Sequence, residues 1–332
     1  MDYYDTVASQ PVELRRSAEQ VRSALASADL DPWRSGTVVV VAMGASAHAG
    51  NALVDRLLRH GRPAFNLDAS TVMELGGRSA LADSYVIVSE GGRSRETVEA
   101  ARSLPAGTRL GLTNAPASPF GEAVDLVVGL GHGPDSRVYT IGYTATLQAF
   151  SLLATALDGE GDGADLDALP GEVDVALNAF GGRAAGIAER LADLDSLDFV
   201  GRGASLASAA EGALLFREAT HTATAAFETF QYLHGPMEGL SERRGCVVIG
   251  SGRELSLASF LAERGIFTVL LTNEDLDEKE NLAVVRIAEQ APLSRAVLEI
   301  VPLQLVAGEL ARRRGLGVDG FVFSQQDTKI PA

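Results

Sequence analysis

Cysteine is almost missing from this chain of 332 residues, which has a single one, Cys246. A disulfide framework needs pairs of cysteines, so the sequence excludes one, and it argues against a metal site built on cysteine ligands. Cys246 stands inside an apolar run, where we expect the thiol simply to pack.

Long apolar runs and a basic surface are also lacking. The longest runs, such as residues 37–43, have the length of strands and fall well below the roughly 18 residues of a membrane span. The N-terminus has no basic start followed by an apolar core, so we expect no secretory signal, no membrane partner and a cytoplasmic location. A net charge of −16 argues against a nucleic-acid surface, because binding phosphate backbones requires clustered cations.

Lysine is scarce, since only two of the 28 basic residues are lysines, Lys279 and Lys329. A mechanism that requires a lysine amine, such as a Schiff base, therefore has two candidates and no more. His60, His132 and His221 show no ligand spacing, so we predict neither a metal nor another cofactor.

Short apolar runs that alternate with helical patterns are what the sequence does contain, and the pattern restarts in the second half. The expected strands lie at residues 37–43, 63–67, 85–89, 109–113, 126–130, 198–203, 246–250, 267–272 and 283–287. Buried strands separated by helices are typical of parallel sheets with crossover helices. The sequence therefore predicts an α/β protein with two doubly wound lobes, each a mostly parallel sheet flanked by helices.

The expected organisation has five parts. An N-terminal helical segment (1–35, with its helix at about 12–25) precedes the first lobe (36–157). An acidic, glycine-rich linker and a helix (158–195) lead to the second lobe (196–316). The tail (317–332) shows no periodicity and is a candidate to close over a site.

Two loops suit phosphate binding, because backbone N–H groups at a helix N-terminus, assisted by hydroxyls and glycines, hold phosphate well. The first is Gly44, Ala45 and Ser46, ahead of a helix expected at 51–59. The second runs from Ser89 to Ser94, ahead of a helix expected at 95–104. Its candidate binding residues are Ser89, Glu90, Gly91, Gly92 and Ser94.

Three strings carry a family resemblance: DTVASQPVEL (5–14), VIVSEGGRSRETVEAA (86–101) and GRGASLASAAEGALLFREATHTATAAFETFQYLHGP (201–236). They resemble the double-SIS (sugar isomerase) proteins, and most of all the isomerase half of glucosamine-6-phosphate synthase and its stand-alone relatives. The resemblance implies two SIS lobes that bind a sugar phosphate. We expect no glutaminase domain and no glutaminase activity.

The phosphate loops depart from the family pattern. Gly91 replaces a hydroxyl residue, and Ala45 stands where the family has Ser or Thr. Because the carboxylate of Glu90 would repel a phosphate dianion, we expect it to turn away or to meet Arg93 or Arg95. A third family element, GPDSRVYTIGYTATLQ (133–148), retains hydroxyls such as Thr140 but lacks its lysine, whose charge Arg137 is a candidate to supply.

The resemblance assigns two catalytic residues. Glu218 matches the glutamate that moves a proton between C1 and C2 of the opened sugar, and His234 matches the histidine that opens the ring. A buried carboxylate and a histidine suit such proton transfers near neutral pH. Glu211, two helical turns before Glu218, projects from the same face, and His48 is close enough to the first loop to line the site. The family histidine reaches the neighbouring subunit, so a homodimer with shared sites is expected.

The tail differs from the family in the position of its lysine. Val318 and Asp319 match the element that precedes the family's lysine, and an ungapped count puts Gln326 at the lysine position. Lys329 lies three residues later and would reach the site only if the tail shifts. Both are possible tail contacts, and the mismatch argues against Schiff-base chemistry.

Three functions remain open. The first is a phosphosugar isomerase or lyase that removes the C2 proton of a hexosamine 6-phosphate, and then isomerises it or, with N-acetylglucosamine 6-phosphate, eliminates water. The second is a non-catalytic sensor of a sugar phosphate. The third is a fructosamine-phosphate deglycase or deaminase. Retention of Glu218 and His234 favours the first.

Overall fold

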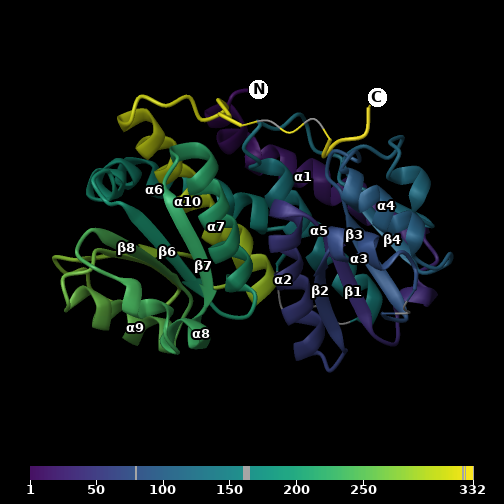
Figure 1. Cartoon of the computed structure of the whole chain (residues 1–332), viewed down its shortest axis with the longest axis horizontal. Coiled ribbons are helices and arrows are strands. Elements are labelled where there is room, and N and C mark those ends of the chain that lie inside the picture. Colours follow the sequence, from purple (N-terminus) through teal and green to yellow (C-terminus); the bar gives the residue numbers. More distant parts are fainter. Residues whose placement is uncertain (79–80, 160–164, 324, 326, 332) are drawn as a thin grey trace.

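Two parallel five-stranded sheets form the centres of two lobes in the computed structural model, which describes residues 1–78, 81–159, 165–323, 325 and 327–331 (Figure 1). The strands of the first sheet are β1 (Val38–Ala42), β2 (Ala64–Asp68), β3 (Ser84–Val88), β4 (Arg109–Thr113) and β5 (Leu126–Gly129). Those of the second are β6 (Ser196–Gly201), β7 (Ala223–Glu228), β8 (Arg244–Ile249), β9 (Thr268–Thr272) and β10 (Leu282–Arg286). β1, β3 and β9 are buried throughout, as expected of strands covered on both faces.

The two sheets share one topology. The strand order is β2-β1-β3-β4-β5 in the first and β10-β9-β8-β6-β7 in the second, which is the same order when each lobe is counted along the chain. Every neighbouring pair is parallel. The predicted fold class is confirmed. In such sheets ligands bind beyond the carboxyl ends of the strands where the order reverses, here between β1 and β3 or between β6 and β8.

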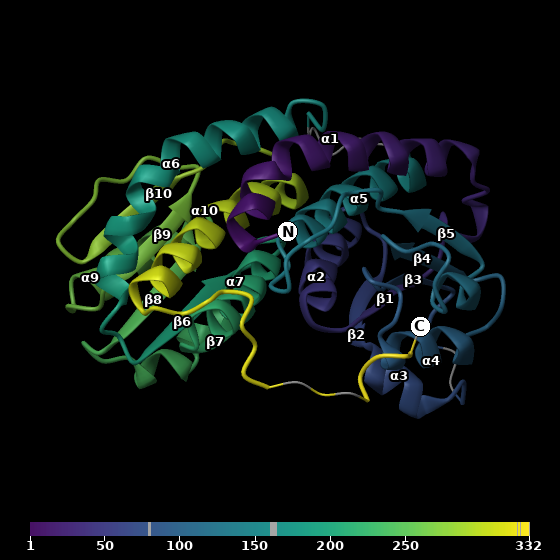
Figure 2. The ribbon, with the colours of Figure 1, turned by 90° about the horizontal axis from the view of Figure 1, so that it is seen from above.

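The helices cover both sheets and join the lobes. They are α1 (Tyr3–Ser27), α2 (Gly44–Arg59), α3 (Ala69–Leu75), α4 (Arg95–Ser103), α5 (Ile141–Asp158), α6 (Leu169–Leu191), α7 (Ser205–Thr220), α8 (Thr229–Leu233), α9 (Arg253–Ala262) and α10 (Pro292–Arg313). α2 of the first lobe packs on α7 of the second, and α1 contacts α5, α6 and α10 (Figure 2). One hydrophobic core therefore runs through both lobes. None of the described helices has the length and apolar character that crossing a membrane requires.

Several boundaries differ from the sequence-based expectations. α2 begins at Gly44 rather than at residue 51, because the small residues that look like a loop, such as Ala45, Ala47 and Ala49, are good helix formers. The last helix, which the sequence pattern places at residues 302–314, is α10 and already begins at Pro292, so Pro302 lies inside it. The strand β7 was not predicted. The helix expected together with the linker in residues 158–195 is α6 (Leu169–Leu191), and residues 160–164 lie outside the described part.

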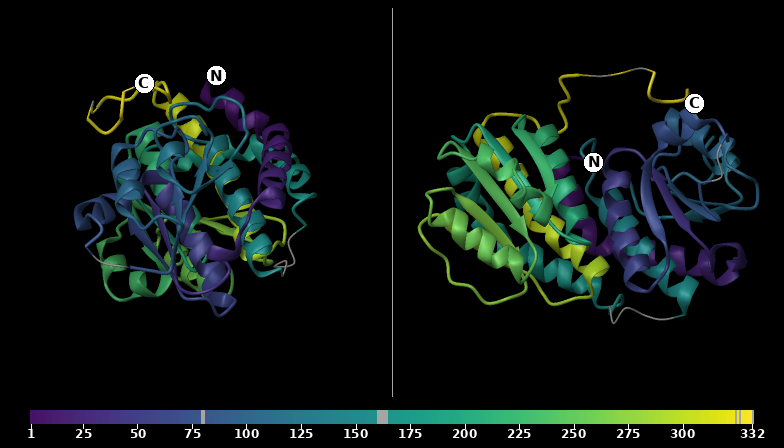
Figure 3. Two further views of the ribbon diagram at one scale, coloured as in Figure 1. Left: turned by 90° about the vertical axis from the view of Figure 1, so that its right-hand side faces the viewer. Right: turned by 60° about the horizontal axis from the view of Figure 1, so that its bottom comes forward.

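The tail leaves the second lobe and ends on the first (Figure 3). Arg95 N donates to Thr328 O at 3.0 Å and Ile330 N to Arg93 O at 2.9 Å. Lys329 between them forms an antiparallel bridge with Ser94. The tail is therefore held on the loop that follows β3, across the space between the lobes.

Candidate active site

A cavity of about 710 Å³ lies where the carboxyl ends of β1 and β3, the helix α7 and the tail meet. The first sheet reverses its order at these two strands, so this is the position that the topology favours for a ligand. Its wall consists of Met43, Gly44, Ala45, Ser46, Val88, Ser89, Glu90, Gly91, Ser94, Glu96, Thr97, Asp135, Ser136, Arg137, Tyr139, Glu211, Leu214, Glu218, Phe321, Thr328 and Lys329.

Both loops predicted to hold phosphate contribute to this wall. α2 and α4 start at the two loops, and neither has a side chain that caps its first turn. Ser46, Ser89 and Ser94 all line the cavity, and the buried hydroxyl of Thr97 lies there without a hydrogen-bond partner. Arg95 N, the first N–H group of α4, is bonded to Thr328 O of the tail. The other N–H groups at the two helix starts, which no side chain caps, together with these hydroxyls make this end of the cavity suitable for an anion.

Two of the predicted binding residues have other roles. Gly92 does not line the cavity. Its φ of +66° forms the turn of the second loop, and a Cβ there would overlap Ser118 Oγ, so this glycine is required by packing. The hydroxyl of Thr140 is buried and donates to Asp135 Oδ1 at 2.8 Å, where Asp135 also accepts from the first N–H groups of α5. Ligand contact by Gly92 and Thr140 remains a prediction.

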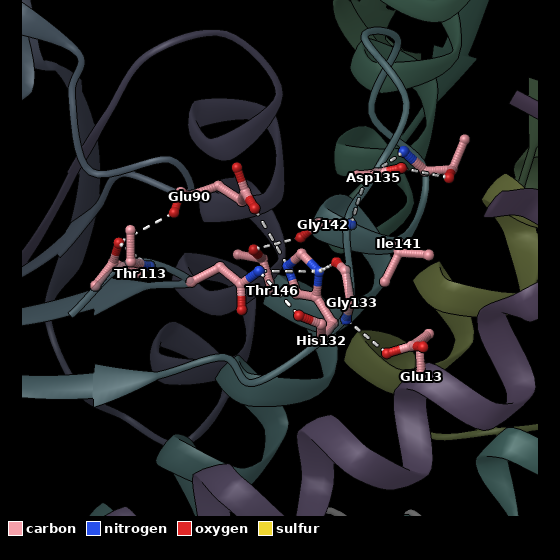
Figure 4. Close-up of polar contacts among 12 residues, drawn as sticks. Glu13, Glu90, Thr113, His132, Gly133, Asp135, Ile141, Gly142 and Thr146 are labelled. Carbon is pink, nitrogen blue, oxygen red and sulfur yellow. Dashed lines mark hydrogen bonds and ion pairs between the residues drawn. The ribbon is translucent and has the colours of Figure 1, made fainter. Parts of the chain in front are cut away.

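Glu90 does not turn away, and it does not meet an arginine. Its Oε1 lies 3.4 Å from Nε2 of His132, a histidine for which the sequence suggested no role (Figure 4). Arg95 instead donates to Asp327 O at 2.8 Å. The guanidinium of Arg137, which was expected to supply the charge of the family lysine, lies 4.5 Å from the centroid of the Phe321 ring. Arg137 therefore packs against a residue of the tail.

The carboxylates of Glu211 and Glu218 line the cavity from the same face of α7, as their spacing predicts. His48 Nδ1 is 3.0 Å from Glu211 Oε2, so His48 reaches the site through Glu211 and is not itself part of the wall. Burial raises the pKa of Glu211. Burial, followed by the negative charge of Glu211, raises the pKa of Glu218 to about 7, while the charge of His48 lowers it. A carboxyl group with such a pKa can accept and return a proton near neutral pH.

His234 lies apart from this cavity. It follows α8, is exposed, and is not part of the wall in its own chain. Its assignment to the site of a neighbouring subunit remains a prediction.

The tail brings a lysine into the cavity. Gln326, to which the ungapped count points, lies outside the described residues, whereas Lys329 is part of the wall. The positive charge of Lys329 lowers the pKa of Glu90, but it is not among the charges that shift the pKa of Glu218. Lys329 therefore acts at the end of the cavity formed by the second loop.

Several wall residues were not predicted, among them Thr97, Tyr139, Leu214 and Phe321. Glu96 had a weak signal, since it is the acidic residue in the first turn of α4. The sequence carried no signal for the aromatic residues, because Tyr139 reaches Glu90, and Phe321 reaches Arg137, only once distant segments of the chain are packed together. No group of three or more histidine, cysteine or acidic residues that could hold a metal occurs within the described part of the chain.

Comparison with known proteins identifies the class. Residues 190–312 match the family described as SIS domain, so the second lobe is a SIS domain. A glutamine–fructose-6-phosphate aminotransferase (isomerizing) of Thermus thermophilus is 29% identical over 314 residues, which is 87% of this chain and 51% of that protein. A homologous aminotransferase of Pyrobaculum aerophilum is 27% identical over 301 residues, 85% of this chain and 49% of its own. The chain spans about half the length of the curated relatives it matches.

Solved structures extend the likeness to both lobes. The C-terminal domain of glucosamine-fructose-6-phosphate aminotransferase from Francisella tularensis has a TM-score of 0.84 at 20% identity, covering 95% of this chain and 96% of its own. Glucosamine-6-phosphate deaminase from Thermotoga maritima has a TM-score of 0.77 at 20% identity, with 96% of both chains covered. The resemblance to double-SIS proteins is confirmed: residues 190–312 match the SIS domain family, and both lobes together have the fold of these proteins.

Proposed function

We propose that this protein removes the C2 proton of a hexosamine 6-phosphate, with Glu218 as the base. The observation that carries the proposal is the position of Glu218, whose pKa is raised to about 7, on the wall of a cavity that also holds two uncapped helix starts. The base stands on the second lobe and the anion-binding groups on the first. A sugar phosphate that spans the cavity would place its phosphate at one end and C2 at the other.

The proposed reaction consists of two proton transfers on the opened sugar. Glu218 takes the proton from C2 of the opened aldose, which leaves an enediol or enol-type intermediate. With a free amine at C2, returning the proton to C1 gives the 2-imino form of the ketose, which water hydrolyses to the ketose 6-phosphate and ammonia. With a hydroxyl at C2, the same step gives the ketose directly. If the C2 nitrogen is acylated, loss of the C3 hydroxyl gives elimination instead, so dehydration of N-acetylglucosamine 6-phosphate is the second outcome of the same step. His234 of the partner subunit would open the ring in a homodimer with shared sites.

Lys329 serves as a counter-charge for the phosphate in this proposal. Its charge acts on Glu90, at the second loop, and no such effect on Glu218 is found. In this proposal the site abstracts the proton without an imine between Lys329 and the sugar, although Lys329 lines the cavity. A Schiff base between Lys329 and the sugar would instead support the deglycase or deaminase alternative.

A sensor without turnover is the competing candidate, favoured by the acidic Glu90 at the phosphate loop. Incubation with glucosamine 6-phosphate, N-acetylglucosamine 6-phosphate and fructose 6-phosphate in D₂O, followed by NMR, separates the candidates. Exchange at C2 or at the corresponding ketose carbon supports the enzyme, and Glu218→Gln should abolish it. Glu238→Gln, which alters an exposed glutamate outside the cavity, is the matched control. Binding of a phosphate ester without any exchange would establish the sensor.

A further inference from the structure

The buried pair formed by Glu90 and His132 is not explained by the proposed proton transfer at C2. The His132 side chain has no exposed surface, and that of Glu90 is 14% exposed, where it lines the cavity. His132 Nδ1 lies 2.8 Å from Gly133 O. The amide nitrogen of Asn114 also lies 3.3 Å from Nδ1, but it donates to His132 O at 3.1 Å. Because the oxygen of Gly133 can only accept and makes the shorter contact with Nδ1, Nδ1 carries a hydrogen, and Nε2 is the ring atom that faces Glu90 (Figure 4).

The chain makes room for Glu90 in this inward position. A Cβ at Gly142 would lie 3.1 Å from Glu90 Cγ and 3.2 Å from Asp135 Oδ2, so any other residue at position 142 would crowd the glutamate. The hydroxyl of Tyr139 also hydrogen-bonds to Glu90. The orientation of Glu90 is thus a packed feature and not one rotamer of a free side chain.

One proton is needed between the two side chains. With Nδ1 protonated, a neutral His132 presents the lone pair of Nε2 to Glu90 Oε1 at 3.4 Å, and an ionised carboxylate presents another lone pair. Two acceptors facing each other out of water are unfavourable. A single shared proton removes the conflict and leaves the pair with no net charge, whereas its loss leaves one negative charge at the phosphate loop.

The other charged and titratable groups around Glu90 come from different elements. Asp135 and Tyr139 belong to the segment before α5, and Lys329 belongs to the tail. Asp135 is engaged as the acceptor at the start of α5. Burial raises the pKa of Glu90, and the charge of Asp135 raises it further. The charges of His132 and Lys329 lower it, but the net direction is upward.

We infer that the Glu90–His132 pair links anion binding at the second loop to the uptake of one proton, so that the loop accepts a dianionic phosphate group only while the pair is protonated. This inference rests on the proposed function in placing the phosphate at that loop. The proton comes from water, the charge of the pair changes from −1 to zero, and no covalent bond to the ligand forms. Above the pH at which the free pair loses its proton, affinity for a dianion should fall by about tenfold per pH unit.

The test uses inorganic sulfate, a dianion that does not itself titrate between about pH 5.5 and 8.5, whereas a phosphate ester does. Binding is measured by calorimetry in the Glu218→Gln background, because Glu218 itself titrates in this range. In this parent, the affinity for sulfate should fall as the pH rises. After Glu90→Gln the affinity should no longer depend on pH, and at high pH it should exceed that of the parent. Glu96→Gln, which removes another carboxylate of the same wall, should keep the slope. Melting curves check that each variant is folded.

The outcomes separate this inference from the proposed function. Sulfate binding with no pH dependence in the parent, or a slope that persists after Glu90→Gln, overturns the proton linkage and leaves the phosphate site intact. Absence of sulfate binding at every pH in all variants overturns the phosphate site and the linkage with it. If the pH dependence of sulfate affinity also disappears in Glu96→Gln, it reflects the total negative charge of the cavity, and the Glu90–His132 pair is not its source.

Discussion

Lys329 and Ser94 form an antiparallel β-bridge, which fixes the C-terminal tail to the loop that follows β3. The bridge places a lysine in the cavity on the wall shared with the first lobe, while the proposed base Glu218 enters from the second. The tail is thereby part of the candidate site, and removing it would take away Phe321, Thr328 and Lys329 together.

The first prediction tests whether Lys329 acts through its charge. Lys329→Ala should raise the KM for a hexosamine 6-phosphate by about tenfold or more, the scale of a lost hydrogen bond to a charged group, with little change in kcat. Lys329→Arg keeps the charge but cannot form an imine, so it should restore most of the affinity. Steady-state kinetics on both variants gives the comparison.

An imine mechanism makes the opposite prediction. Lys329→Arg would then be as inactive as Lys329→Ala, and borohydride added with substrate would attach the sugar to the protein. Mass spectrometry of the treated protein distinguishes these cases. A sugar adduct on Lys329 would exclude the mechanism without an imine.

The second prediction concerns Glu218. As a base it must be ionised, so kcat/KM should rise with pH through about 7. Glu218→Gln should lower turnover by at least about 10²-fold. Full activity well below pH 6, or a profile that Glu218→Gln leaves unchanged, would assign the base to another group.

The same shift affects stability. The pKa of Glu218 is higher in the folded state than the ordinary value of 4.5, so the folded protein binds a proton that the unfolded chain releases. Stability relative to Glu218→Gln should therefore decrease as the pH rises from about 4.5 to about 7 and stay constant above. Denaturant unfolding of both proteins across this range measures the difference.

Much of the fold could be predicted from local patterns, because continuous β-branched runs such as residues 38–41 strongly favour buried strands over helices or loops. The strand β7 was missed since its sequence, ATAAFE, is rich in alanine and carries no strand signal. In the site, the seven-residue spacing of Glu211 and Glu218 on one helix was enough to place both carboxylates together. The direction of Glu90 depends on Gly142 and His132, which are distant in sequence, so it required the packed structure. Likewise, counting residues along the tail could not show that Lys329 enters the cavity.

The third prediction concerns assembly. His234 is exposed and outside the cavity of its own chain, so it can act only if a second subunit brings it to a site. Glu218→Gln and His234→Ala proteins should each be inactive, and a mixture allowed to exchange subunits should recover up to about a quarter of wild-type activity, since random mixing leaves one intact site in half of the dimers. Exchange is verified by native mass spectrometry with one isotopically labelled partner. Exchanged dimers that stay inactive would exclude shared sites.

The last prediction concerns the charge of Glu211. Its carboxylate is buried beside His48 and raises the pKa of Glu218. Glu211→Gln removes this negative charge, while the amide oxygen can still accept a hydrogen bond from His48. With less repulsion in the cavity Glu218 should ionise more readily, so the rise of kcat/KM should move to lower pH, and activity at pH 8 should change much less than activity at pH 6. Glu96→Gln removes a carboxylate from the same cavity that is not among the charges acting on Glu218, so it should leave the position of the rise unchanged. A rise that stays in place in Glu211→Gln would mean that Glu211 is already neutral in the free enzyme, and burial alone would then account for the pKa of Glu218.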